Sequence, residues 1–109
     1  MLTVEEIHTL IDRIATHLRP AKIIIFGSYA KQTATARSDL DLLVVLDTPV
    51  SRQYRSQLIN PLIASYSVPI DVHVLTPAEY TALSGVQHSF IHAAATTGKV
   101  AYDRSWDRR

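Results

Sequence analysis

The stretch IIIFGSYAKQTATARSDLDLLVVL, residues 23–46, decides the fold of this 109-residue chain. It holds two apolar runs joined by a polar connection. Residues 21–26 are short, β-branched and apolar on both faces, which is typical of a buried central strand ending at Gly27. Residues 40–46 form a second such strand, but Asp41 interrupts its start, where an acid is costly unless it has a function. We expect a turn and a short helix between the two strands.

The N-terminal segment predicts a helix. Its apolar residues recur at three- and four-residue steps from Thr3 to Leu18, and Thr3 with Glu6 fits a capping box. Residues 51–65 are helical by composition, with a break or kink expected at Asn60-Pro61 because proline lacks the backbone donor.

The C-terminal half predicts a strand, two helices and a short edge strand. Residues 69–75 form the strand, and Thr76-Pro77 starts the first helix. Residues 90–97 form the second helix, residues 99–102 the edge strand, and residues 103–109 a polar tail that we expect to be frayed.

Composition limits the class of protein. The chain is 47% hydrophobic, which suits one compact domain spanning residues 1–109. Eleven basic residues against ten acidic ones give a formal charge of +1, without the basic block of a dedicated nucleic-acid binder. There is no cysteine, secretory signal or membrane-length apolar run, so we expect a soluble cytoplasmic protein without direct nucleic-acid or membrane binding.

Gly27-Ser28 is a candidate phosphate-binding turn. At the end of a buried strand, free backbone N–H groups and a following helix bind phosphate, and glycine allows close approach. For a Gly-Ser pair alone, an ordinary turn glycine followed by an ordinary N-cap is the better interpretation. The pair therefore needs supporting residues.

Asp39-Leu40-Asp41 supplies this support, after ten intervening residues, 29–38. In an extended segment, side chains two apart share a face with Cα atoms ~7 Å apart, so both carboxylates converge. Such acids repel each other unless a cation lies between them, and Mg²⁺ accepts carboxylates together with water and phosphate oxygens. For Asp39 alone, a solvated strand-entry turn capped by aspartate is the better interpretation, whereas Asp41 leads directly into the apolar run and is not explained in this way.

Asp71 is the third acid, again within an apolar strand-like run, and a neighbouring strand would bring it beside the first pair. Three acids plus substrate phosphates can ligate two metal ions ~3.5–4 Å apart. His73 shares the strand face of Asp71 and can support the metal ligands, although a packed or surface histidine is the commoner case. Lys31 and Arg37 can steer a triphosphate or be solvated loop charges.

Gly27-Ser28, ten residues, Asp39-Leu40-Asp41 and a later strand aspartate, Asp71, together resemble the active site of the DNA-polymerase-β-like nucleotidyltransferase superfamily. In length the chain is similar to its minimal nucleotidyltransferase group, which includes the MntA-type antitoxins. The resemblance implies an α/β (α+β) fold with a small mixed sheet flanked by helices, ATP as cosubstrate and two Mg²⁺ ions.

The resemblance also implies roles for individual residues. Asp39 and Asp41 would hold both metals, and Asp71 would complete one metal site and help deprotonate the attacking hydroxyl. Gly27 and Ser28 would hold the outgoing pyrophosphate. Many relatives carry arginine where this chain has Lys31, and lysine would grip phosphate as a point charge without a bidentate fork.

Relatives of this size often act as antitoxins that add AMP to a tyrosine of a HEPN-type toxin encoded nearby. The resemblance thus implies a protein adenylyltransferase with a HEPN partner. Two alternatives remain open: a binding antitoxin that masks its partner without catalysis, and an aminoglycoside-type small-molecule nucleotidyltransferase with a separate substrate-binding subunit.

Overall fold

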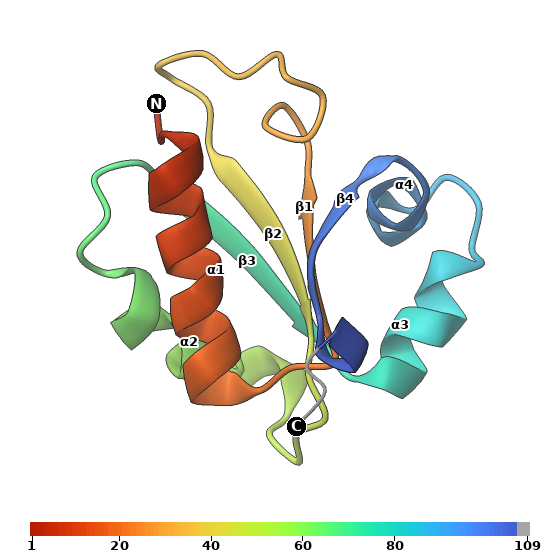
Figure 1. The fold of residues 1–109 in the computed structure, drawn as a ribbon. Helices are drawn as coiled ribbons and strands as arrows, with labels where there is room; N and C mark the ends of the chain where they lie inside the picture. Colours follow the sequence, from red (N-terminus) through yellow and green to blue (C-terminus); the bar gives the residue numbers. More distant parts are fainter. Residues whose placement is uncertain (107–109) are drawn as a thin grey trace.

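The computed structural model describes residues 1–106 and contains one four-stranded mixed sheet (Figure 1). The strands lie in the order β3-β2-β1-β4, and their bounds are Lys22–Phe26 for β1, Leu40–Val45 for β2, Ile70–Leu75 for β3 and Lys99–Asp103 for β4. β1 pairs antiparallel with both β2 and β4, whereas β2 and β3 run parallel. The expected central strand, second strand, third strand and edge strand are all confirmed.

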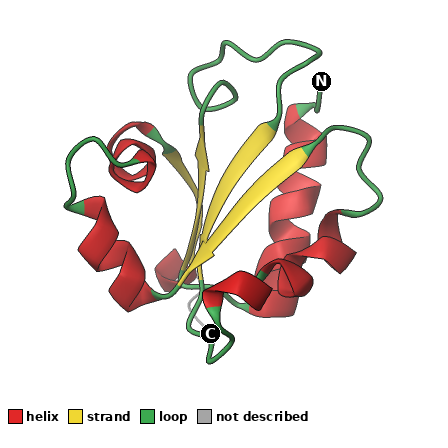
Figure 2. Ribbon diagram, turned by 180° about the vertical axis from the view of Figure 1, so that it is seen from behind, coloured by secondary structure: helices red, strands yellow, loops and turns green. Residues whose placement is uncertain are grey.

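Helices cover both faces of the sheet. Their bounds are Val4–Leu18 for α1, Ser56–Ile63 for α2, Pro77–Ser84 for α3 and Phe90–Thr97 for α4, with short 3-10 helices η1 at Arg52–Tyr54 and η2 at Arg104–Trp106. Figures 1 and 2 show α1 and α2 on one face and α3 and α4 on the other. The expected α/β (α+β) fold, a small mixed sheet flanked by helices, is therefore confirmed.

The core is built by the alternation of side chains along β2. Leu42 and Val44 point to the α1 and α2 face, and Leu43 points to the α3 and α4 face, all with no exposed surface. Burial of each leucine side chain contributes about 2 kcal/mol relative to exposure. β2 is thus held from both sides, which fixes the position of any side chain at its start.

Capping boxes begin α1 and α3 where the sequence predicts. The Thr3 side chain accepts a hydrogen bond from the Glu6 N–H, and Glu6 accepts one from the Thr3 N–H. Thr76 and Glu79 form the same reciprocal pair at α3. Each capping box satisfies two backbone donors that the helix leaves free.

The expected short helix after Gly27 is wrong. Residues 27–32 form a single tight turn, in which the Lys31 N–H donates to the Gly27 carbonyl at 3.1 Å. Gln32 then adopts a left-handed φ of 60°, and the Thr33 N–H donates to the Ser28 carbonyl at 2.9 Å. This hydrogen bond closes the turn as a helix C-terminus is closed, so the chain cannot continue as a helix.

Two other expectations differ from the structure. α2 continues through Pro61 and ends at Ile63, so the expected break at Asn60-Pro61 is wrong. Only one intrahelical hydrogen bond is lost there, in the last turn of the helix. In the tail, Asp103 belongs to β4 and its carboxylate accepts from the Ser105 N–H, while residues 107–109 lie outside the described part of the chain.

Candidate active site

The pairing of β2 with β3 brings two of the predicted acids together. Asp41 lies directly opposite Asp71 in the parallel register. Side chains along a strand point alternately to the two faces of the sheet. Leu42 and Val72 point to the α1 and α2 face, so the preceding residues, Asp41 and Asp71, point to the other face, on which Leu43 and Leu75 pack against α4. Acids separated by 30 residues in the sequence thus occupy neighbouring positions at the entry of two strands.

Asp39 completes the acidic group. It lies in the connection immediately before β2, where its side chain is exposed. Burial raises the pKa of Asp41, and repulsion from the Asp71 and Asp39 carboxylates raises it further, against a smaller lowering by His73. The three predicted carboxylates are therefore close enough to one another for their charges to interact.

Gly27 is required where β1 passes this group. Its φ is +74°, a conformation that side chains with a Cβ rarely adopt. A Cβ at this position would also collide with the Asp41 carboxylate oxygen Oδ2. The backbone of the turn therefore runs directly against the Asp41 carboxylate.

The turn presents polar groups that other residues do not occupy. Within residues 1–106, the N–H groups of Ser28 and Tyr29 and the Ser28 hydroxyl donate to no other residue. Backbone N–H groups in a turn of this kind form an anion-binding concavity. Because no helix follows, these donors act without the helix dipole that the sequence had suggested.

The donor set fits a divalent cation in its chemistry. Three carboxylates repel one another around Asp41, and a cation of the magnesium type relieves such repulsion. In the part of the chain that the structure describes, no three histidine, cysteine, aspartate or glutamate side chains lie close enough to enclose a metal ion by themselves. Water and substrate phosphates would therefore supply a large part of the coordination shell.

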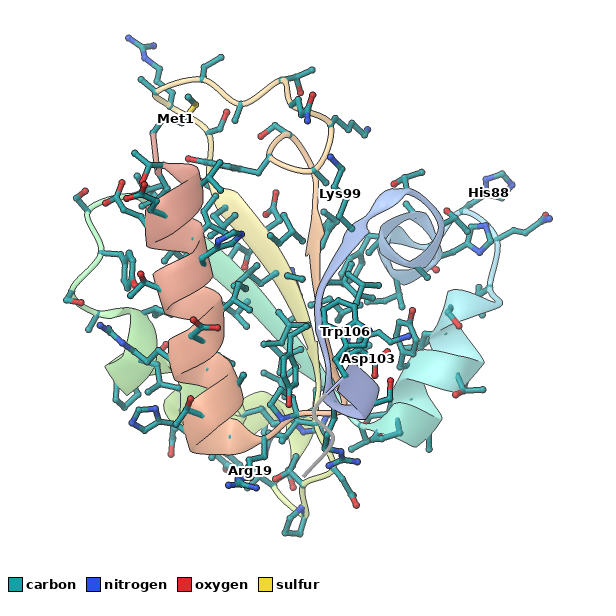
Figure 3. All side chains as sticks on the ribbon, in the orientation of Figure 1. Met1, Arg19, His88, Lys99, Asp103 and Trp106 are labelled. Atoms are coloured by element: carbon teal, nitrogen blue, oxygen red, sulfur yellow. The ribbon has the colours of Figure 1, made fainter. Side chains whose placement is uncertain are left out.

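The two basic candidates lie on the surface. Lys31 ends the tight turn and Arg37 belongs to the connection before Asp39, and both side chains are exposed. A cavity of about 550 Å³ lies on the other face of the sheet, between the start of α1, the turn and β4, and includes Tyr29 and Lys99 among its lining residues. Lys99 and Met1, at the same end of the molecule, are labelled in Figure 3.

A group of aromatic side chains lies beside Asp71, and the sequence did not reveal this contact. The His73 Nε2 lies 3.3 Å from the Asp71 Oδ2, and the His73 ring centre lies 4.7 Å from that of Phe90 at the start of α4. Phe26, the residue before Gly27, lies 6.0 Å from His73 and 6.4 Å from Phe90. His73 was a candidate, but no sequence signal linked Phe90 to it because their contact depends on how α4 packs.

Comparison with known families identifies the family of the chain. A family model described as a nucleotidyltransferase domain matches residues 7–91. The chain belongs to this family. The matched span contains Gly27, Ser28 and the three carboxylates, so the resemblance inferred from these residues is confirmed at the level of the family.

A curated relative of this nucleotidyltransferase also carries the name of an enzyme that transfers nucleotides. The chain is 34% identical over 84 residues to a Methanocaldococcus jannaschii protein named "Putative protein adenylyltransferase MJ0604", and the match covers 77% of this chain and 80% of the relative. The expectation of an enzyme that transfers nucleotides is confirmed by the family and by this relative.

Solved structures show the same fold for this nucleotidyltransferase. A "putative nucleotidyltransferase" from Sulfolobus solfataricus superposes with a TM-score of 0.63 at 18% identity, covering 91% of this chain and 78% of that one. A toxin–antitoxin structure with AMP-PNP superposes with a TM-score of 0.61 at 22% identity, covering 88% of this chain and 73% of that one. Over residues 1–106, no helix is long and apolar enough to cross a membrane.

Proposed function

We propose that this nucleotidyltransferase transfers AMP from ATP to a tyrosine hydroxyl of a protein partner, and that the partner is a HEPN-type toxin which the transfer silences. The observation that carries the proposal is the register of β2 and β3, which sets Asp41 opposite Asp71 beside the Gly27 turn. The adenylyltransferase name of the archaeal relative and the toxin–antitoxin fold match support the acceptor class.

The proposed reaction assigns a task to each residue. Gly27 and Ser28 bind the β- and γ-phosphates through the free turn donors, which orients the α-phosphorus towards the acids. Asp39, Asp41 and Asp71 would hold magnesium, which when bound neutralises phosphate charge and stabilises the leaving oxygen. Lys31 adds a positive charge beside the phosphates.

The acceptor is activated from the β3 side. Asp71, whose side chain is 57% exposed, accepts the proton of the incoming hydroxyl. The acceptor oxygen then forms a bond to the α-phosphorus, the bond between the α-phosphorus and the bridging oxygen breaks, and pyrophosphate leaves. Atoms and charge balance with AMP on the partner and one proton released.

The exposed positions of Asp39 and Asp71 favour a folded acceptor. The described residues form one sheet with four helices and add no separate layer that encloses a small molecule over the acids. A protein partner would cover the open face and exclude water from the reacting groups. This is the reason for preferring a protein acceptor to an aminoglycoside-type one.

Intact-mass measurement tests the proposal. Purified chain, MgATP and the protein encoded next to it should give a partner heavier by one or more AMP groups. Asp39→Asn and Asp41→Asn should abolish the adduct, while Asp47→Asn, an exposed aspartate just beyond the opposite end of β2, should retain it. Absence of an adduct with the wild-type chain rejects the proposal.

The same variants separate catalysis from masking. If Asp39→Asn and Asp41→Asn still silence the partner, the chain acts as a binding antitoxin. If the neighbouring protein is not modified but an added aminoglycoside is, the chain is a small-molecule nucleotidyltransferase with a separate substrate-binding subunit.

A further inference from the structure

An aromatic ledge borders the acids on the face of the sheet that α3 and α4 cover. We define it as the side chains of His73 and Phe90, with Phe26 behind them. The rings of His73 and Phe90 are tilted by 51° to each other, so they do not form a parallel stack. Phe90 is 46% exposed, an unusual surface for a phenylalanine whose ring already contacts two others.

The position of the ledge ties it to Asp71. His73 reaches the Asp71 carboxylate through its Nε2 at 3.3 Å, while its ring contacts Phe90 at 4.7 Å between centres. The ledge and the carboxylate are thus successive parts of one surface, apolar at the α4 end and acidic at the β3 end. A ligand that lies along this surface needs an apolar ring at one end and a polar group at the other.

We propose that the ledge binds the ring of an aromatic acceptor, a phenol such as a tyrosine side chain, and directs its hydroxyl to Asp71. This inference rests on the proposed function and deepens it by naming what selects the acceptor. Aromatic rings associate in tilted and offset arrangements, which the open angle of the ledge allows. The hydroxyl of serine or threonine lies one bond beyond Cβ and has no ring to fill the ledge.

The nucleotide base is the competing occupant. The free donors for phosphate belong to the turn after β1, which is separated from β3 by β2. A nucleotide held by that turn reaches the acids from the β1 side, where Phe26 directly precedes the turn, and the surface at Asp71 and His73 on β3 remains for the acceptor. An uncharged phenol also approaches three carboxylates without the repulsion that an anionic group would meet.

Binding of a small phenol tests the ledge without catalysis. We expect N-acetyl-tyrosinamide, titrated to millimolar concentrations into the full chain with Mg²⁺ and AMP-PNP, to shift the ring NMR signals of Phe90 and His73 in a saturable way. N-acetyl-serinamide should leave them unchanged. No shift with the phenol, or equal shifts with both probes, overturns the proposal.

Variants of Phe90 test whether the phenol binds at the ledge. Phe90→Leu keeps apolar bulk but removes the ring, and it should weaken phenol binding about tenfold, while Phe90→Tyr keeps the wild-type affinity. The affinity for AMP-PNP should be unchanged in both. Val86→Ala, which removes an exposed apolar side chain outside the ledge, should alter neither. Loss of AMP-PNP affinity in Phe90→Leu with unchanged phenol binding assigns the ledge to the base and overturns the proposal.

Transfer kinetics extend the test to the partner. Phe90→Leu should raise the KM for the protein acceptor about tenfold with little change in kcat, because the ring positions the acceptor and takes no part in bond making. An unchanged KM overturns the proposal. If the phenol binds the ledge as expected but wild type modifies no partner, the proposed transfer is wrong and the ledge stands as a phenol-binding site.

Discussion

Gly27→Ala is expected to disable the site by one added methyl group. Gly27 has a φ of +74°, and a left-handed conformation costs a residue with a Cβ about 1 kcal/mol. The new Cβ also collides with the Asp41 Oδ2, so the carboxylate must rotate or the turn must shift, at a further cost of about 1 kcal/mol. Loss of about 2 kcal/mol lowers the melting temperature of a domain this size by about 10 °C.

The shift of the Asp41 carboxylate or of the turn should lower the transfer rate more than it lowers the stability. A reacting or metal-binding group displaced by about 1 Å reduces the rate by about 100-fold. Two glycines provide matched controls. Gly85→Ala adds a methyl group in open space and should change neither stability nor rate, while Gly98→Ala collides with Ile24 and the backbone of α4 and should lower stability without touching the acids.

The assay combines thermal unfolding with the initial rate of AMP transfer for all three variants. If Gly27→Ala loses activity only in proportion to its loss of folded protein, as Gly98→Ala should, the contact between the turn and Asp41 has no catalytic role. If Gly27→Ala has wild-type stability and activity, the assignment of the turn is wrong.

Three further predictions concern charged groups. Asp41→Asn should abolish transfer. It should leave the free energy of unfolding in urea titrations unchanged or up to about 1 kcal/mol higher, because it removes a partly buried charge that two other carboxylates repel. A large loss of stability would contradict this prediction. Arg55→Met should lower the free energy of unfolding by about 3 kcal/mol. Buried Arg55 donates hydrogen bonds to the Val50 and Val74 carbonyls and to Glu79, and its removal leaves these three acceptors without this donor. Wild-type stability would refute the prediction. The pKa of Glu79 is lowered to about 2, chiefly by its hydrogen bond from Arg55, so the pair stabilises the fold above the ordinary pKa of 4.5, and this contribution is lost as pH falls from there towards 2. Because Glu79 is one-third exposed, we expect a loss of about 1–2 kcal/mol between about pH 6 and pH 3, and a smaller loss in Glu79→Gln; identical pH profiles would contradict it.

Local patterns in the sequence were sufficient for the four strands and for the starts of two helices, and they singled out Asp41. The run before Gly27 is apolar on both faces because β1 lies in the middle of the sheet, and the capping boxes at Thr3 and Thr76 act within one turn. Asp41 stood out because an acid interrupted a buried strand, and the register of β2 with β3 gives it Asp71 as a neighbour.

Features that depend on distant contacts or on a single backbone angle were not predictable. The left-handed Gln32 that closes the turn after Gly27 carries no sequence signal of its own. Phe90 reaches His73 only through the packing of α4. Buried Arg55 resembles any surface arginine of a helical segment until its bonds to the Val50 carbonyl, to β3 and to α3 are known. In each case the decisive partner lies 17 or more residues away along the chain or belongs to the backbone.

A crystal structure of the chain with Mn²⁺ and AMP-PNP, using the anomalous signal of manganese, locates the metal and phosphate sites. We expect manganese coordinated by the carboxylates of Asp39, Asp41 and Asp71, with AMP-PNP phosphates hydrogen-bonded to the Ser28 hydroxyl and the turn N–H groups. Manganese bound away from these three carboxylates, or phosphates bound away from the Gly27-Ser28 turn, would contradict this expectation.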